Sequence, residues 1–224
     1  MEKEILFKNE FYPSGLTKEM VINYYSENKN NILSQLDNKP IAMFIWTGKD
    51  YIVKRNDNNK PIYLNETNYE KILYSRVISL GIEMEKNPKK IVIDIDPPKK
   101  YSLKNIKLCV SDILNSSLAK KEFFEDFKII SSSTSFHIWL MLNKKIDVDV
   151  LKHISIKELG IEFKDRYLIG KKRNLNDNQI NIDFSSMKNR GVYLFPFSLC
   201  RNGLICKDVT LNWKTFKHMD ARIS

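Results

Sequence analysis

Two aspartates, Asp94 and Asp96, close an apolar strand that begins at Ile91. Because side chains two apart in a β-strand point to the same face, these two carboxylates project together. Like charges at this spacing repel unless a cation neutralises them, and Mg²⁺ takes carboxylate and phosphate oxygens as ligands. Pro97 and Pro98 end the strand and leave the pair at an open edge. The pattern indicates a metal site for phosphate chemistry, and a solvated strand end is the alternative.

A third carboxylate, Asp183, lies inside a later apolar strand, where its charge needs a partner or a metal ion. Three carboxylates that meet form the ligand set for two metal ions about 3.5–4 Å apart, which stabilise the attacking and leaving oxygens of phosphoryl transfer. Arg190 could then clamp a triphosphate, and Ser198 could add a hydroxyl donor. The alternative for Arg190 is a solvated turn.

A serine-rich turn at residues 131–135 leads into a strand, with Ser135 and His137 on one face. Small hydroxyl residues let backbone and hydroxyl donors approach a phosphate closely, and a histidine can donate to the same oxyanion. A buried structural histidine beside the turn is the ordinary alternative.

These side chains depend on strands and helices that the sequence also predicts. Thr17 is expected to cap a helix that runs to about residue 30, and Ile41–Trp46 with Tyr51–Lys54 to form a hairpin. Further helices are expected at 67–81, at 102–118 and at 148–172, the last broken at Gly160. Strands are expected at 91–95, 128–131, 136–142, 181–184, 192–195 and 204–207. The fold class is therefore α+β, with a mainly antiparallel sheet and flanking helices.

Composition narrows the class of protein. The chain has 224 residues, 42% of them hydrophobic and 29% charged, which is typical of a globular protein with a sizeable core. No stretch is long and apolar enough for a membrane span, and no secretory signal begins the chain, so we expect an intracellular protein. The formal net charge of +10 favours a polyanionic partner such as nucleic acid. Three cysteines and three histidines without metal-ligand spacing argue against zinc.

In this order and spacing, the three motifs resemble those of the archaeo-eukaryotic primase (primase-polymerase) superfamily. That superfamily has an apolar strand ending in Asp-x-Asp, then Ser-x-His, then an apolar residue and Asp, which correspond here to residues 92–96, 135–137 and 181–183. The stretch from Arg190 to Ile205 is similar to the DNA primase small (catalytic) subunit. Residues 11–18, together with 94–98, are more similar to the polymerase domain of ligase D-type end-joining systems.

The resemblance implies one catalytic domain over residues 1–224, with an N-terminal lobe to about residue 85 and a metal-binding lobe over about 86–224. Asp94, Asp96 and Asp183 would hold two Mg²⁺ or Mn²⁺ ions and act as the catalytic residues. The nucleotide would be bound by Ser135, His137, Arg190 and Ser198. The implied substrates are a DNA template with its primer and an NTP or dNTP. The implied protein partners are a primase large subunit, or a ligase and an end-binding protein.

The implied activity is template-directed nucleotidyl transfer to a 3′-hydroxyl, in primer synthesis or in DNA repair. An end-joining or gap-filling polymerase without priming activity is one alternative. A catalytically weak nucleic-acid-binding module is another, in which aromatic side chains stack on bases. A third is a phosphoesterase that uses the same carboxylates with water as the nucleophile.

Overall fold

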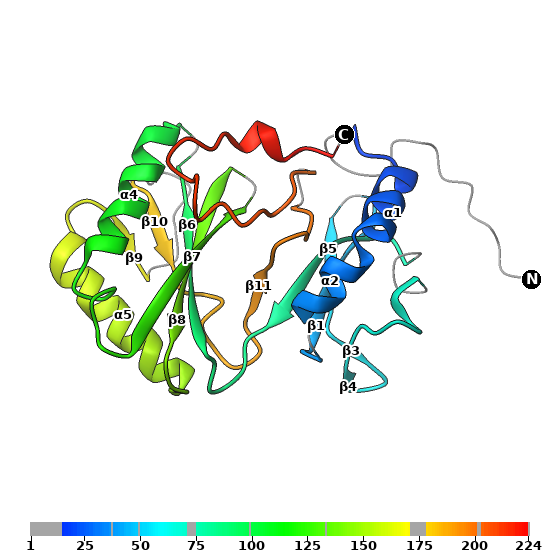
Figure 1. Cartoon of the computed structure of the whole chain (residues 1–224), viewed down its shortest axis with the longest axis horizontal. Helices are drawn as coiled ribbons and strands as arrows, with labels where there is room; N and C mark the ends of the chain where they lie inside the picture. The colour runs from blue at the N-terminus through cyan, green and yellow to red at the C-terminus, as the bar shows by residue number, and fades with distance from the viewer. Residues whose placement is uncertain are drawn as a thin grey trace, which may run out of the picture.

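The computed structural model describes residues 15–36, 38–48, 50–70, 75–98, 100–132, 134–170, 178–200 and 203–223. Within them the chain forms two main β-sheets, with helices α1 and α2 along one sheet and α4 and α5 on the outer side of the other (Figure 1). Residues 11–14 of the N-terminal motif and Ser133 of the serine-rich turn lie outside the described residues. The α+β class and the antiparallel character predicted from the sequence are confirmed.

The first sheet has four antiparallel strands in the order β11-β5-β1-β2. Their bounds are β1 (Ile41–Trp46), β2 (Tyr51–Lys54), β5 (Val77–Glu83) and β11 (Val192–Leu194). The predicted hairpin of β1 and β2 is confirmed, with Trp46 opposite Tyr51 at its closed end. A short pair, β3 (Asn56–Asp57) and β4 (Lys60–Pro61), lies beside this sheet.

The helix predicted over 67–81 is wrong in its second half, because β5 occupies that segment as an inner strand. All seven residues of β5 are buried, so the segment lacks the polar alternation that marks a strand with one solvated face. Gly81 lies within the strand instead of capping a helix. A Cβ there would lie 2.4 Å from Cγ1 of Val192, so glycine is what allows β11 to pair so closely.

The second sheet has five strands in the order β7-β8-β6-β10-β9. They are β6 (Lys90–Asp96), β7 (Phe124–Ser132), β8 (Ser135–Leu142), β9 (Leu168–Ile169) and β10 (Asn181–Asp183). Each pairing is antiparallel except that of β9 with β10. Along β6, Ile91, Ile93 and Ile95 lie on the face covered by α4 and α5, so the alternating Asp94 and Asp96 lie on the opposite face.

Polar side chains cap three of the four helices, as far as the described residues show. Thr17 caps α1 (Lys18–Glu27), Ser102 caps α4 (Leu103–Asn115) and Asp147 caps α5 (Val148–Phe163), while α2 is Lys29–Leu36. The predicted starts after 17 and 102 are confirmed. The predicted break at Gly160 is wrong, since α5 continues through it to Phe163. None of these helices combines the length and apolarity that a membrane span requires.

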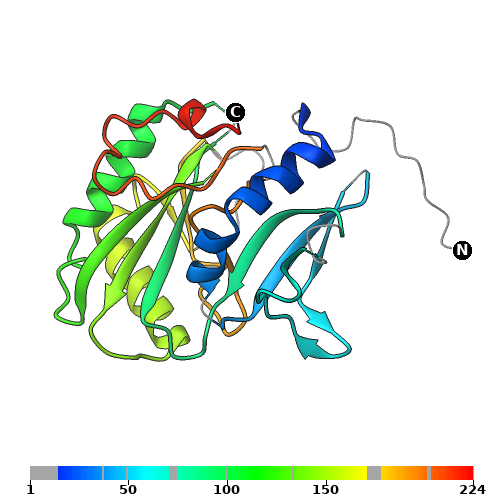
Figure 2. The ribbon, with the colours of Figure 1, turned by 45° about the vertical axis from the view of Figure 1, so that its right-hand side comes forward.

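The C-terminal segment runs along the five-stranded sheet, where Asp208 pairs with Ile130 of β7 (Figures 1 and 2). The strand predicted at 204–207 is reduced to isolated bridges, in which Ile205 pairs with Leu199 and Leu204 with Arg222. A short 3₁₀ helix, η2 (His218–Ala221), follows. The orange segment carrying β11 leaves the five-stranded sheet and joins the edge of the four-stranded one (Figures 1 and 2). The division into lobes at about residue 85 stays a prediction.

Two glycines offer a matched test of this packing. A Cβ on Gly191 would lie 1.8 Å from the carbonyl oxygen of Ser186, whereas one on Gly160 would meet nothing within 4 Å. We expect Gly191→Ala to lower the free energy of unfolding by about 1–3 kcal/mol, the usual cost of overpacking. Gly160→Ala should raise it by about 0.5–1 kcal/mol, because alanine is the better helix former. Urea unfolding of both variants measures this, and equal effects would contradict it.

Candidate active site

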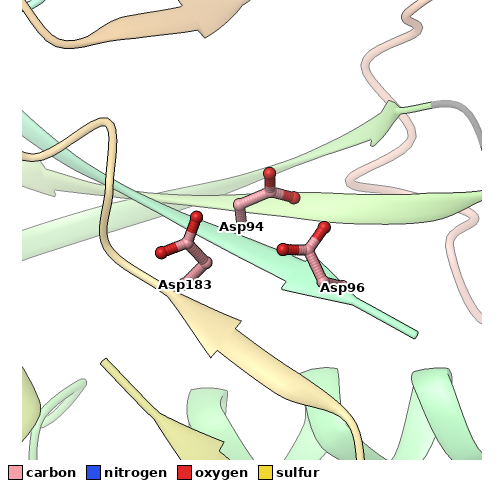
Figure 3. Close-up of side chains that lie close together, drawn as sticks. All are labelled: Asp94, Asp96 and Asp183. Carbon is pink, nitrogen blue, oxygen red and sulfur yellow. The ribbon is translucent and has the colours of Figure 1, made fainter. Parts of the chain in front are cut away.

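The three predicted aspartates meet on one face of the five-stranded sheet (Figure 3). Asp94 on β6 lies directly opposite Asp183 on β10, and Asp96 lies two residues further along β6. One carboxylate oxygen from each lies within 4.8 Å of the others, and all three side chains are partly buried. Three negative charges this close repel one another, so the site favours a cation.

His137 extends the same row of side chains on the other side of β6. It lies opposite Asp94 in the β6–β8 pairing, and its Nε2 is 3.2 Å from Oδ1 of Asp94. Burial disfavours the charged imidazolium, but the Asp94 carboxylate outweighs this effect and raises the pKa of His137 above its ordinary value. Its Nδ1 is buried and has no partner in the described part of the chain. One ring nitrogen therefore contacts Asp94, and the other is a buried polar atom that no described residue uses.

Ser135 lies next to this row but uses its hydroxyl within the protein. Its Oγ donates to the carbonyl of Ile95, the residue between the two β6 aspartates. Its own carbonyl lies 2.7 Å from Nε2 of His218, which reaches it from the C-terminal segment. Ser135 thus fixes the end of β8 against the end of β6, and direct phosphate binding by its hydroxyl stays a prediction.

Three further residues were not singled out by the sequence reasoning. Ser185 holds the third aspartate, donating its N–H to Oδ1 of Asp183 at 2.9 Å and its hydroxyl to Oδ2 at 2.5 Å. Asn181 lies opposite Asp96, is only 3% exposed, and its Oδ1 has no partner among the residues described. A serine two residues after an aspartate at a strand end is a recognisable turn signal. The position of His218 depends on long-range packing.

A pocket of about 160 Å³ adjoins Asp94 and lies between the two sheets. Asp94, His137 and Ser186 line it from the side of the five-stranded sheet, while Phe44 and Tyr193 belong to the other sheet. The remaining lining residues are Ser79, Val92, Ser132, Ser185, Val192 and Leu194. A ligand in this pocket would contact both sheets and the imidazole of His137.

Arg190 is not among the residues that line this pocket. Its guanidinium binds both carboxylate oxygens of Glu83, at 2.7 and 3.0 Å, and Oδ1 of Asn56 at 2.8 Å. Its backbone has a φ of 60°, and its carbonyl accepts a hydrogen bond from Arg55. Glu83 is a buried carboxylate, so this ion pair neutralises a charge that would otherwise be costly. A clamp on a triphosphate by Arg190 stays a prediction.

Ser198 is placed differently from the nucleotide-binding role predicted for it. Its side chain is fully buried, and its hydroxyl donates to the carbonyl of Leu80 at 2.6 Å and accepts from the Leu80 N–H at 3.2 Å. The hydroxyl has no exposed surface for a nucleotide. Ser198 instead joins the segment after β11 to the inner strand β5.

The donor set fits a hard divalent cation. Asp94, Asp96 and Asp183 offer carboxylate oxygens on one face, and they are the one group of three or more ligating side chains found in the described residues. Mg²⁺ and Mn²⁺ prefer such oxygens.

Removing one charge from the cluster should change stability in opposite directions with and without metal. Without metal, we expect Asp96→Asn to raise the free energy of unfolding by about 1 kcal/mol through reduced repulsion. With Mn²⁺ the wild type should gain stability and the variant much less, because binding to the folded state stabilises it. Thermal unfolding in EDTA and in Mn²⁺ measures both effects.

The control for this experiment is Asp165→Asn, which removes an exposed carboxylate outside the cluster. It should respond to Mn²⁺ as the wild type does. An Asp96→Asn protein that is destabilised in EDTA and still fully stabilised by Mn²⁺ would contradict the assignment.

A comparison with solved structures identifies the fold of the chain. No protein-family model and no curated protein sequence matches the chain. Among solved structures, it is similar to the polymerase domain of Mycobacterium tuberculosis ligase D in complex with DNA, with a TM-score of 0.67 and 12% sequence identity. The match covers 98% of this chain and 93% of that one. The chain therefore has the fold of that polymerase domain over nearly its whole length.

Proposed function

We propose that the chain is a template-directed nucleotidyltransferase of the primase-polymerase type. The observation that carries the proposal is the convergence of Asp94, Asp96 and Asp183 on one sheet face, beside a pocket that also contains His137. The shared fold with the ligase D polymerase domain supports it, and so does the net charge of +10.

In this proposal, the 3′-hydroxyl of a primer or of an initiating nucleotide attacks the α-phosphorus of an incoming nucleotide, and the bond to pyrophosphate breaks. Asp94, Asp96 and Asp183 would hold Mg²⁺ or Mn²⁺, which when bound lower the pKa of the attacking hydroxyl and stabilise charge on the leaving oxygen. His137, whose pKa is raised beside Asp94 and whose Nδ1 is unused among the described residues, is suited to donate to a phosphate oxygen.

Between the two biological uses, we favour gap filling or end joining over primer synthesis. The structural match is to a polymerase domain of ligase D, and it covers 98% of this chain. The natural substrate would then be a gapped or broken DNA duplex. Primer synthesis on a single strand is the second candidate.

The test is nucleotide incorporation by the purified chain with Mn²⁺ or Mg²⁺, on a gapped duplex with a 5′-phosphate and on an unprimed single strand. Replacing Asp94 and Asp96 together by asparagine should lower incorporation by at least about 100-fold, since it removes the main electrostatic stabilisation of the transition state. Asp165→Asn, the exposed control, should retain wild-type rates.

The substrates separate the alternatives. Extension at the gap alone supports repair synthesis, whereas products on the unprimed strand that disappear in the double variant identify a primase. Degradation of labelled DNA without added nucleotides would favour a phosphoesterase. DNA binding with no incorporation under any condition would contradict the proposal and favour a binding module.

A further inference from the structure

A second and larger pocket, of about 410 Å³, opens near the other end of β6. Its charged lining is dominated by four lysines, accompanied by two glutamates: Lys39, Lys89, Lys90, Lys145, Glu83 and Glu85. Both glutamates already have cationic neighbours. Glu83 is bound by Arg190, and Glu85 lies 4.0 Å from Lys145. The pocket, called the lysine pocket below, therefore has an excess of positive charge.

Lys90 is the central group of the lysine pocket. Its Nζ lies 3.4 Å from the ring centroid of Trp139 and 4.8 Å from that of Tyr193, so two aromatic rings flank the amine. Aromatic faces attract a cation but do not replace a counter-ion. Within the described ranges no carboxylate forms an ion pair with Lys90, and the buried indole Nε1 of Trp139 has no acceptor. Of these two donors, Lys90 lines the pocket, and its amine lacks an anionic partner there.

The environment makes the charge of Lys90 costly in the absence of such a partner. Burial, followed by the positive charges of Lys39 and Lys128, lowers the pKa of Lys90 to about 7, while Glu85 acts in the opposite direction. The amine is therefore partly neutral near pH 7. An anion bound in the pocket would supply the missing negative charge and restore the ammonium form.

Lys90 lies on the same strand, and on the same face of it, as Asp94 and Asp96. Residues 90, 92, 94 and 96 alternate with the helix-covered isoleucines, so Lys90 faces the crevice between the sheets as Asp94 does. Four residues of strand separate Lys90 from Asp94 by about 13 Å. The two pockets also share Tyr193 as a lining residue. The crevice thus has an acidic end at the aspartates and a basic end at Lys90.

We propose that the lysine pocket binds a phosphate-type oxyanion, with Lys90 as its central donor and Lys39 and Lys89 as flanking cations. The site is separate from the metal-binding aspartates. The oxyanion has two possible sources, a backbone phosphate of a nucleic-acid strand or a free polyphosphate. The first source rests on the proposed function, whereas the second does not.

The first experiment measures binding of inorganic pyrophosphate by isothermal titration calorimetry in EDTA, which prevents any contribution from metal at the aspartates. We expect Lys90→Met to weaken binding at least tenfold, because methionine keeps the apolar stem between the rings and removes the amine. The matched control is Lys214→Met, since Nζ of Lys214 also lies over a tryptophan ring, 5.7 Å from the centroid of Trp213, but outside the pocket. Equal affinity in wild type and Lys90→Met would overturn the proposal.

Proton uptake gives a second and sharper readout. The charged or titratable groups that surround Lys90 are Lys39, Glu83, Glu85, Lys89, Lys128, Lys145 and Tyr193. An anion raises the pKa of Lys90 above about 7, so binding takes up a proton at higher pH, and affinity falls by up to about tenfold per pH unit above 7. Titrations in buffers of different ionisation enthalpy measure this uptake. It should disappear in Lys90→Met, and its persistence there would contradict the assignment.

Further variants keep the test decisive. If Lys90→Met does not fold, Lys39→Met should still weaken pyrophosphate binding several-fold, and an unchanged affinity would overturn the proposal. The Asp94→Asn/Asp96→Asn protein should bind pyrophosphate as the wild type does in EDTA. Pyrophosphate binding in EDTA requires no catalysis. It therefore tests the lysine pocket even if the chain proves to have no polymerase activity.

A single-stranded oligonucleotide identifies the source of the oxyanion. If Lys90→Met weakens oligonucleotide binding more than Lys214→Met does, and pyrophosphate competes with the oligonucleotide, the pocket holds a backbone phosphate. If only pyrophosphate binding depends on Lys90, the ligand is a free polyphosphate. Weak binding of both ligands that is identical in all variants and disappears with added salt would indicate non-specific attraction to the basic surface and would overturn the proposal.

Discussion

The pairing of β6 with its two neighbours is the constraint on which the candidate site depends. The register sets His137, Asp94 and Asp183 opposite one another across β8, β6 and β10. A shift of one residue in either pairing would move an entire set of side chains to the helix-covered face. The buried isoleucines of β6 prevent that shift, since it would expose them and bury carboxylates. The apolar side of the strand thus holds the acidic side in place.

Around this row, ordinary polar contacts fix the strand ends. Ser135 connects the end of β8 to the carbonyl of Ile95, and His218 holds the backbone of Ser135 from the C-terminal segment. At the end of β10, Ser185 donates two hydrogen bonds to the carboxylate of Asp183 and fixes its position. A cluster of like charges needs such support, because its repulsion acts against the fold until a cation binds.

The sequence predicted the local parts of this arrangement well. Local sequence determines three of these features: the Asp-x-Asp end of β6, the hairpin of β1 and β2, and the polar helix caps. Thr17 and Ser102 are examples of such caps. The convergence of the three aspartates was also predicted, since period-2 alternation and a similar motif order indicated it. Long-range features were missed. Nothing near Ser198 in sequence shows that its hydroxyl is bonded to Leu80, and β5 lacks alternation because both of its faces are buried.

The pairing of β11 with β5 has a consequence for the order in which the chain can fold during synthesis. The inner strand β5 is complete by Glu83, but its second neighbour is made only at Val192–Leu194. Until then, β5 is an edge strand of apolar residues with unpaired backbone groups, the kind of edge that pairs with other chains. The nascent N-terminal half therefore exposes this strand edge until more than a hundred further residues have been added.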